Sequence, residues 1–144
     1  MILNELTAIG PVDGRYRRVT SGLAPFMSEW GLMRYRVKME VEYLLALGAV
    51  LPALNDANLG AHSSALRNIY ESFTDEDALT IKHTEKTTNH DVKAVEYFVK
   101  EKLDALGLGA VKEYVHFGLT SQDINNTAIP LSFKDANEAV LFPL

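Results

Sequence analysis

Apolar residues recur every three or four positions along most of this chain, and this spacing constrains the fold more than any other feature of the sequence. Between Ser28 and Gly48 the recurring positions are Leu32, Tyr35, Met39, Tyr43 and Leu47. Ser28 can cap the start of a helix and Gly48 can end it. No segment alternates apolar and polar residues over a strand's length between turn signals. We therefore predict an all-α fold.

Two further helices are expected between residues 59 and 90. The stretch 59–73 places apolar residues on one face and polar ones toward water, with Leu66, Ile69, Tyr70 and Phe73 on the apolar face. Thr74 then opens a third helix, because Thr74 and Asp77 have the spacing of a capping box, in which side chains satisfy free backbone amides.

Two helices are also expected in the last third of the chain. Asp91 can cap a helix that Gly107 ends, and residues 124–142 form the last helix. Pro130 should kink that helix near Ala128, because it removes a backbone donor. By contrast, glycines and prolines punctuate the first stretch, through about Ala24, too densely for a long helix. This stretch should be an ordered arm or loop.

Composition and charge exclude several classes of protein. Hydrophobic residues make up 47% of the 144 positions and charged residues 23%, which is typical of globular proteins. A net charge of -5 does not favour nucleic acid as a partner. The chain has no cysteine, no signal-peptide pattern at its start and no apolar run long enough for a bilayer. We expect a cytoplasmic protein without a membrane partner.

The first of three polar clusters is the turn from Pro11 to Tyr16, which presents Arg15 and Tyr16 side by side. A guanidinium next to a phenol suits a phosphate or carboxylate ligand, since arginine offers a planar fork of donors and tyrosine one more. A salt-bridged surface turn is the alternative.

The second and third clusters precede expected helices. In the second, Asn89, His90 and Asp91 lie where backbone amides attract anions and a histidine can donate to a carboxylate or move a proton. The alternative is Asp91 as a plain cap after two turn residues. In the third, Thr120 and Ser121 could hold a carboxylate, or Thr120 and Asp123 could form a capping box.

Other histidines give weaker signals. Glu113 and His116 have the Glu-x-x-His spacing of metal-binding helical bundles, but such sites need a second pair and further glutamates, so no metal is expected. His83 and His90 lie seven residues apart, which puts them on one helical face only if the helix continues through Asn89.

Taken in order, three segments resemble the adenylosuccinate lyases, a family of the fumarase/aspartase superfamily. They are PVDGRY near the start, KTTNHDVKAVEYF in the middle and HFGLTSQDINNTA toward the end. The likeness includes their spacing and runs from Leu6 to the helix that begins near Ser121. PVDGRY with TTNHD is typical of the bacterial-type form of the family.

The resemblance implies an all-α N-terminal helical domain, residues 1–112, followed by the start of a central helical-bundle domain, residues 113–144. It implies β-elimination of fumarate from adenylosuccinate, giving AMP, and from succinylated aminoimidazole carboxamide ribotide in purine biosynthesis. No metal or organic cofactor is implied. The full-length protein would be a homotetramer whose active sites draw on several subunits, so the three clusters need not converge within one chain.

The resemblance also assigns roles to the clusters. Arg15 and Tyr16 would contact the nucleotide at or near its phosphate. The 89–91 segment would line the pocket around the succinyl group, with His90 as a donor to the substrate. The third cluster, Thr120 and Ser121, would hold a carboxylate of the fumaryl portion.

Two motifs of the family do not occur in these 144 residues. They are the Ser-Ser-x-Met-Pro-x-Lys-x-Asn loop with the catalytic serine, and a later Thr-His-Gly segment with another histidine. We therefore assign no catalytic residue here and expect a truncated chain that is inactive by itself. The apolar end of the last helix would be covered by a later segment or a partner chain. A non-catalytic nucleotide-binding or structural helical module is the alternative.

Overall fold

A computed structural model describes residues 7, 9–14 and 16–143 of the chain. Helices and short helical turns make up most of this part, which contains no strand, and this confirms the predicted all-α class. Among the described residues, five α-helices are longer than four residues, as predicted. The helices are α1 (Arg17–Thr20), α2 (Ala24–Met27), α3 (Glu29–Val50), α4 (Ser63–Glu71), α5 (Asp75–Thr88), α6 (Asp91–Ala105) and α7 (Ser121–Ala136).

Shorter turns connect these helices. The 3-10 turns cover Pro11–Asp13, Ser21–Leu23, Pro52–Ala57, Leu59–His62 and Gly109–Tyr114, and a π-helical turn follows α7 at Asn137–Leu141. Before Ala24 the described residues form only helical turns of three or four residues, so the predicted absence of a long helix there is confirmed. Pro25 lies in the first turn of α2, where a missing backbone N–H does no harm.

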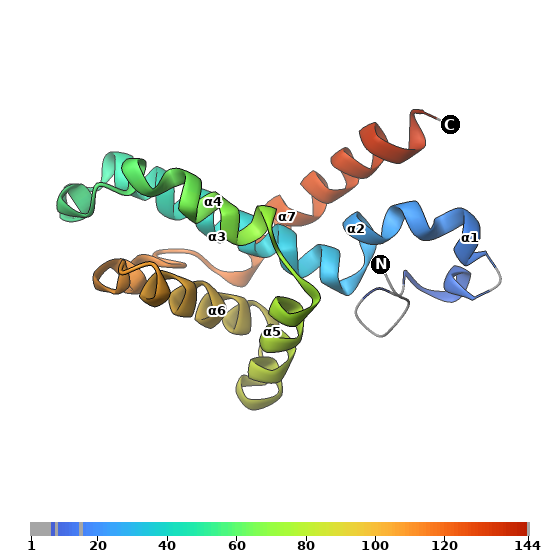
Figure 1. Cartoon of the computed structure of the whole chain (residues 1–144), viewed down its shortest axis with the longest axis horizontal. Helices are drawn as coiled ribbons and strands as arrows, with labels where there is room; N and C mark the ends of the chain where they lie inside the picture. Colours follow the sequence, from blue (N-terminus) through green and yellow to red (C-terminus); the bar gives the residue numbers. More distant parts are fainter. Residues whose placement is uncertain (1–6, 8, 15, 144) are drawn as a thin grey trace.

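Helix α3 lies at the centre of the molecule, and α4, α6 and α7 pack around it (Figure 1). Its buried apolar residues include Met33, Val37, Val41 and Leu44. The predicted stripe was wrong in detail, since Tyr35 is buried but the other four positions are only partly so. A helix covered on several sides buries residues around most of its circumference, so one stripe cannot describe it.

The ends of α3 show one confirmed signal and one error. The Oγ of Ser28 accepts a hydrogen bond from the backbone N–H of Gly31 at 3.1 Å, so Ser28 is the predicted cap. The helix continues past Gly48 to Val50, however, and Pro52 follows. Gly48 permits close packing instead, because a Cβ there would lie 2.9 Å from the Cδ1 of Leu59.

Capping residues and a glycine mark the boundaries of the later helices. Thr74 and Asp77 form the predicted capping box at α5, and Gly107 takes a positive φ of 75° just after α6. The cap of α6 is His90 and not Asp91, which corrects the prediction. The last helix begins at Ser121, earlier than expected, and holds Pro130 in its interior.

A core of aromatic and aliphatic residues joins α3 to α4, α5 and α6. The ring of Phe73 meets the rings of Trp30 and Phe98 edge to face, with centroids 5.3 and 5.8 Å apart. Such pairs stabilise beyond the area that they bury. The indole N–H of Trp30 also donates to the carbonyl of Thr74 at 3.2 Å, which fixes the turn between α4 and α5 against α3.

The far end of α7 carries large apolar side chains on its surface. Phe133 is 52% exposed and Phe142 is 77% exposed. In the part of the chain that the structure describes, no helix has the length and apolar character needed to cross a membrane.

We predict that Gly31→Ala destabilises the protein by about 1–3 kcal/mol, the usual effect of overpacking. Alanine favours a helix over glycine by about 1 kcal/mol, but a Cβ at Gly31 would lie 2.8 Å from the carbonyl oxygen of Pro25 and 2.9 Å from the carbonyl carbon of Phe26. Urea unfolding measures the change. Gly60→Ala is the control, since a Cβ there has no neighbour within 4 Å, and it should be neutral or stabilising. A stabilised Gly31→Ala protein would contradict the close packing of α2 on α3.

Candidate functional site

A sharp change of direction separates α5 from α6. The chain leaves α5 at Asn89, which has a left-handed backbone with φ of 51°, and enters α6 from His90, which is extended. Asparagine tolerates the left-handed region better than most residues. The hydroxyl of Thr88 can donate to the carbonyl of Thr84 or to that of His90, both at 3.2 Å. Because the helix ends here, His83 and His90 do not share one helical face.

The ring of His90 caps α6 and its orientation fixes which nitrogen carries the proton. Its Nδ1 accepts a hydrogen bond from the backbone N–H of Lys93 at 3.1 Å. A nitrogen that accepts a hydrogen bond is unprotonated, so the neutral ring carries its proton on Nε2. His90 therefore presents an N–H donor on the side away from the helix.

The carboxylate of Asp91 is occupied on both oxygens. Its Oδ1 accepts the backbone N–H of Val92 at 2.8 Å, and its Oδ2 lies 2.7 Å from Nη2 of Arg36 on α3. Partial burial raises the pKa of Asp91, but the hydrogen bond from Val92 and the charge of Arg36 outweigh burial and leave the pKa below its usual value. Asp91 is thus an ion whose charge is offset by a neighbouring arginine.

The third cluster forms the start of α7. The carboxylate of Asp123 accepts from the backbone N–H of Thr120 at 2.7 Å and from its hydroxyl at 2.8 Å. These hydrogen bonds lower the pKa of Asp123. The capping-box alternative is thereby confirmed for Thr120 and Asp123. Ser121, the first residue of the helix, takes no part in the box.

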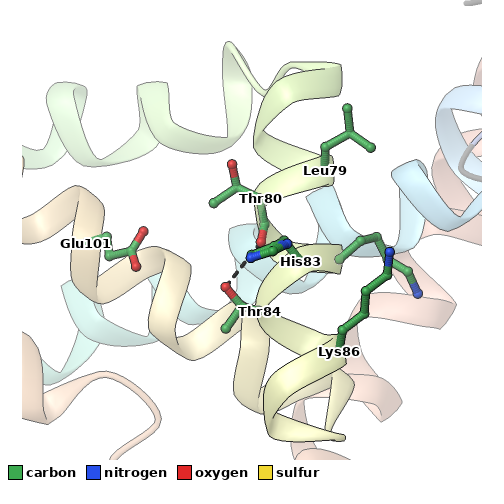
Figure 2. A pocket seen from close by; sticks show the side chains of 7 residues that line it. Leu79, Thr80, His83, Thr84, Lys86 and Glu101 are labelled. Atoms are coloured by element: carbon green, nitrogen blue, oxygen red, sulfur yellow. Dashed lines mark hydrogen bonds between the residues drawn. The ribbon is translucent and has the colours of Figure 1, made fainter.

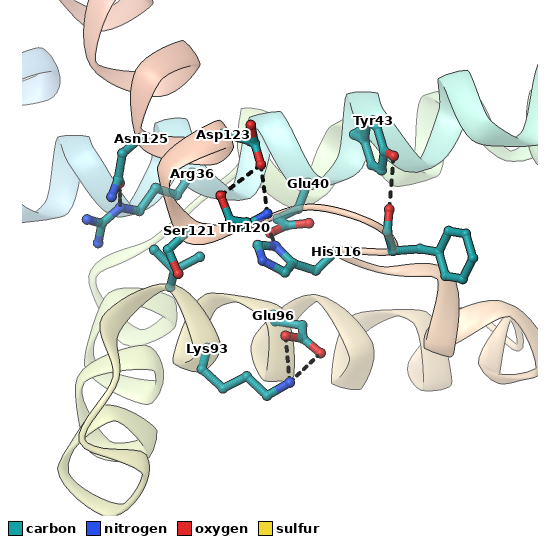
Figure 3. A network of polar contacts seen from close by, with 12 residues as sticks. Arg36, Glu40, Tyr43, Lys93, Glu96, His116, Thr120, Ser121, Asp123 and Asn125 are labelled. Carbon is teal, nitrogen blue, oxygen red and sulfur yellow. Dashed lines mark hydrogen bonds and ion pairs between the residues drawn. The ribbon is translucent and has the colours of Figure 1, made fainter.

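The second and third clusters meet in space although 31 residues separate them. The Oγ of Ser121 lies 3.5 Å from Nε2 of His90, at the outer limit of a hydrogen bond. The His90 ring at the start of α6 and the Ser121 hydroxyl at the start of α7 therefore lie next to each other. Figure 3 shows Ser121 beside Thr120 and Asp123. Side chains already occupy amides at both helix starts, so the groups that remain to bind a carboxylate are the imidazole N–H and the Ser121 hydroxyl.

The first cluster lies elsewhere. Helix α1, which begins directly after Tyr16, is well separated from the α5–α6 junction (Figure 1). Tyr16 is 53% exposed, and Arg15 lies outside the described residues. The carboxylate of Asp13 accepts a hydrogen bond from the backbone N–H of Ile9 and pairs with Arg17 at 2.8 Å. The turn is therefore salt-bridged, as in the alternative interpretation of this cluster.

The structure reveals a buried pair that the sequence did not single out. Glu40 on α3 is fully buried, and its Oε1 lies 2.6 Å from Nδ1 of His116. Its Oε2 has no hydrogen-bond partner within the described part of the chain. His116 has a left-handed backbone with φ of 62°. Glu40 is one of six charged residues of α3, so its charge alone did not mark it in the sequence.

The Glu-x-x-His spacing does not build a joint site. Glu113 pairs with Lys100 at 2.8 Å, while His116 faces Glu40. Among the described residues no cluster of three or more acidic or histidine side chains could hold a metal ion.

An open pocket lies between α5 and Glu101 of α6, away from His90. It has a volume of about 570 Å³ and is lined by Leu79, Thr80, Lys82, His83, Thr84, Lys86 and Glu101 (Figure 2). In this pocket Lys82 is already paired with Glu85 at 2.8 Å and with Glu29 at 3.4 Å. None of the residues in the three clusters lines it, so we do not treat it as the site.

A family model described as "Lyase" matches residues 14–144. The chain therefore belongs to this lyase family. Among its curated relatives is the adenylosuccinate lyase of Dictyostelium discoideum, which is 51% identical over 98% of this chain and 31% of the relative. The adenylosuccinate lyases of Vibrio cholerae and Escherichia coli (strain K12) are each 46% identical over 99% of this chain and 32% of the relative. The chain spans about a third of the length of these relatives.

We predict that the neutral ring of His90 exists almost entirely as the Nε2–H tautomer. The cap to the Lys93 amide requires an unprotonated Nδ1. Long-range ¹H–¹⁵N correlation spectra distinguish the two nitrogens of the ring. The exposed His62 provides a comparison within the same spectrum. A neutral His90 protonated on Nδ1 would contradict the cap.

Two glutamates of α3 should respond to pH with opposite sign. Burial raises the pKa of Glu40 above 4.5, with Glu96 adding to the rise and His116 opposing it. A raised pKa in the folded protein gives stability that is lost as pH rises through that pKa. The free energy of unfolding of the native protein, relative to Glu40→Gln, should therefore fall as pH rises above 4.5.

Glu42 is the matched control for this experiment. Its hydrogen bond from Arg67 lowers its pKa despite partial burial, so its contribution is present at higher pH and lost as pH falls below 4.5. Relative to Glu42→Gln, the native protein should lose stability on acidification. Denaturant unfolding over a pH series measures both differences. A pH-independent difference for Glu40→Gln would refute the raised pKa.

Proposed function

We propose that this chain takes part in the adenylosuccinate lyase reaction, the β-elimination of fumarate from adenylosuccinate to give AMP. The same reaction on succinylated aminoimidazole carboxamide ribotide belongs to the proposal. The observation that carries it is the meeting of His90 and Ser121 at two helix starts. The names of the relatives support it independently.

The chemistry of the elimination explains why such a site is useful. A base removes a proton from the carbon next to a carboxylate, the carbon–nitrogen bond breaks, and an acid protonates the departing nitrogen. Negative charge develops on the carboxylate side during this step, and fixed donors stabilise it. In our proposal the N–H of His90 and the hydroxyl of Ser121 are such donors. Thr120, whose hydroxyl donates to Asp123, lies beside Ser121 at the carboxylate, and Asn89 and Asp91 line the pocket around the succinyl group.

Arg15 and Tyr16 form a separate part of the proposed site, at or near the nucleotide phosphate. The separation of Tyr16 from His90 in this chain (Figure 1) is compatible with a site completed by another subunit. We accordingly propose a cytoplasmic homotetramer, with residues 1–112 in an N-terminal domain and residues 113–144 in a helical bundle. The apolar surface at Phe133 and Phe142 supports assembly, because such a surface on a helix needs a cover. The cysteine-free composition supports the location.

Adenylosuccinate should stabilise the folded chain. A ligand that binds only the native state at a hundred times its Kd adds about 2.7 kcal/mol. Thermal unfolding with and without adenylosuccinate measures the effect, and His90→Ala should remove most of it. His83→Ala is the matched control, because His83 lies on α5 outside the site. If adenylosuccinate does not raise the unfolding temperature, a purely structural module is favoured. If the rise is the same in His90→Ala, the ligand binds at a site other than His90.

The chain alone should release no fumarate from adenylosuccinate. The proposed donors bind substrate, but elimination also needs a base and an acid within hydrogen-bond reach, and we assign neither to these residues. Activity should return when the C-terminal two thirds of the Escherichia coli relative is added. His90→Ala should abolish most of the recovered rate, and His83→Ala should not. Turnover by the purified chain alone would refute this division of roles.

A further inference from the structure

Three polar residues of α3 hold the segment 116–125, which contains the third cluster. Arg36, Glu40 and Tyr43 follow one another at intervals of four and three residues, so they lie on one side of the helix. Nε of Arg36 donates to the side-chain oxygen of Asn125 at 2.9 Å, Glu40 contacts His116 at 2.6 Å, and the hydroxyl of Tyr43 donates to the carbonyl of Phe117 at 2.9 Å (Figure 3).

Arg36 differs from the other two because it also reaches α6. Its Nη2 lies 2.7 Å from the Asp91 carboxylate, and its side chain is only 7% exposed. Asp91 is next to His90, and Asn125 lies one helical turn after Ser121. One buried guanidinium thus joins the two helix starts that carry the candidate site.

Direct contact between α6 and α7 is small, whereas both helices pack on α3. The separation of His90 and Ser121 is therefore set mainly through α3. Arginine is suited to fixing this separation, because its planar guanidinium can bind two partners in fixed directions. A buried arginine also stays paired, because leaving its charge without a partner is costly.

We propose that Arg36 is a positioning residue that fixes the distance between His90 and Ser121 and offsets the charge of Asp91 beside them. The inference about distance stands on the geometry alone, and its importance for binding rests on the proposed function. Without Arg36, the Asp91 carboxylate would repel a carboxylate ligand, and α7 would lose its anchor to α6.

The test uses two variants of Arg36 in the whole chain. Arg36→Met removes the charge and both contacts. Arg36→Lys keeps the charge but lacks the planar guanidinium that binds Asp91 and Asn125 at the same time. We expect Arg36→Met to lose the nuclear Overhauser contact between the His90 ring and the Ser121 side chain. Adenylosuccinate binding should weaken at least about tenfold in Arg36→Met, equivalent to about 1.4 kcal/mol, and by a smaller factor in Arg36→Lys.

Arg67→Met is the matched control. Arg67 also joins two helices through a carboxylate, pairing with Glu42 at 2.8 Å, but it lies outside the site. This variant should keep both the His90–Ser121 contact and the affinity. An equal loss in Arg67→Met would show a general effect of removing an interhelical ion pair and would overturn the proposal.

Asn125→Ala keeps the experiment decisive if Arg36→Met does not fold. It removes only the anchor to α7 and leaves the pair with Asp91 intact, so the His90–Ser121 contact should weaken in a folded protein. An unchanged contact in folded Asn125→Ala or Arg36→Met protein would overturn the positioning role. If the native chain does not bind adenylosuccinate but the contact still depends on Arg36, the proposed function fails and the positioning role stands.

Discussion

The structure depends on the burial of α3 on several sides. A helix in this position cannot turn all its polar side chains toward water, so those that are buried must find partners inside the protein. Arg36 and Glu40 find them on segments that come much later in the chain. Arg36 joins the starts of α6 and α7 to α3, and Glu40 holds His116, in the segment that leads into α7.

The candidate site is consequently a product of packing and of local capping together. Capping sets the directions of the side chains: the His90 ring is held by the Lys93 amide, and Thr120 is held by Asp123. Packing on α3 then brings the His90 ring to 3.5 Å from the hydroxyl of Ser121, the residue after the second cap. Neither helix start alone would distinguish this site from an ordinary capped helix.

Sequence reasoning succeeded where the determining interactions are local. Ser28 and the Thr74–Asp77 pair act within three residues, and the structure confirms both. At α6 the sequence favoured Asp91, a common capping residue, but Arg36 engages that carboxylate and the less usual His90 takes the cap. The roles assigned to the site residues came from the family resemblance, because residue types alone left capping as an equal explanation.

Contacts between distant residues could not be predicted in this way. Nothing near Glu40 in the sequence indicates that its partner lies 76 residues away. The face of α3 was misjudged for a related reason, because its surroundings are set by helices whose positions a periodicity cannot reveal.

The three anchors between α3 and the segment 116–125 have a consequence for motion. A loop held at one point can open alone, but this segment is tied to a rigid helix through His116, Phe117 and Asn125. Opening it requires three polar contacts, two of them partly buried, to break together. We therefore expect its backbone amides to exchange their hydrogens together with those of α3, as one cooperative unit, and not as those of a mobile surface loop do.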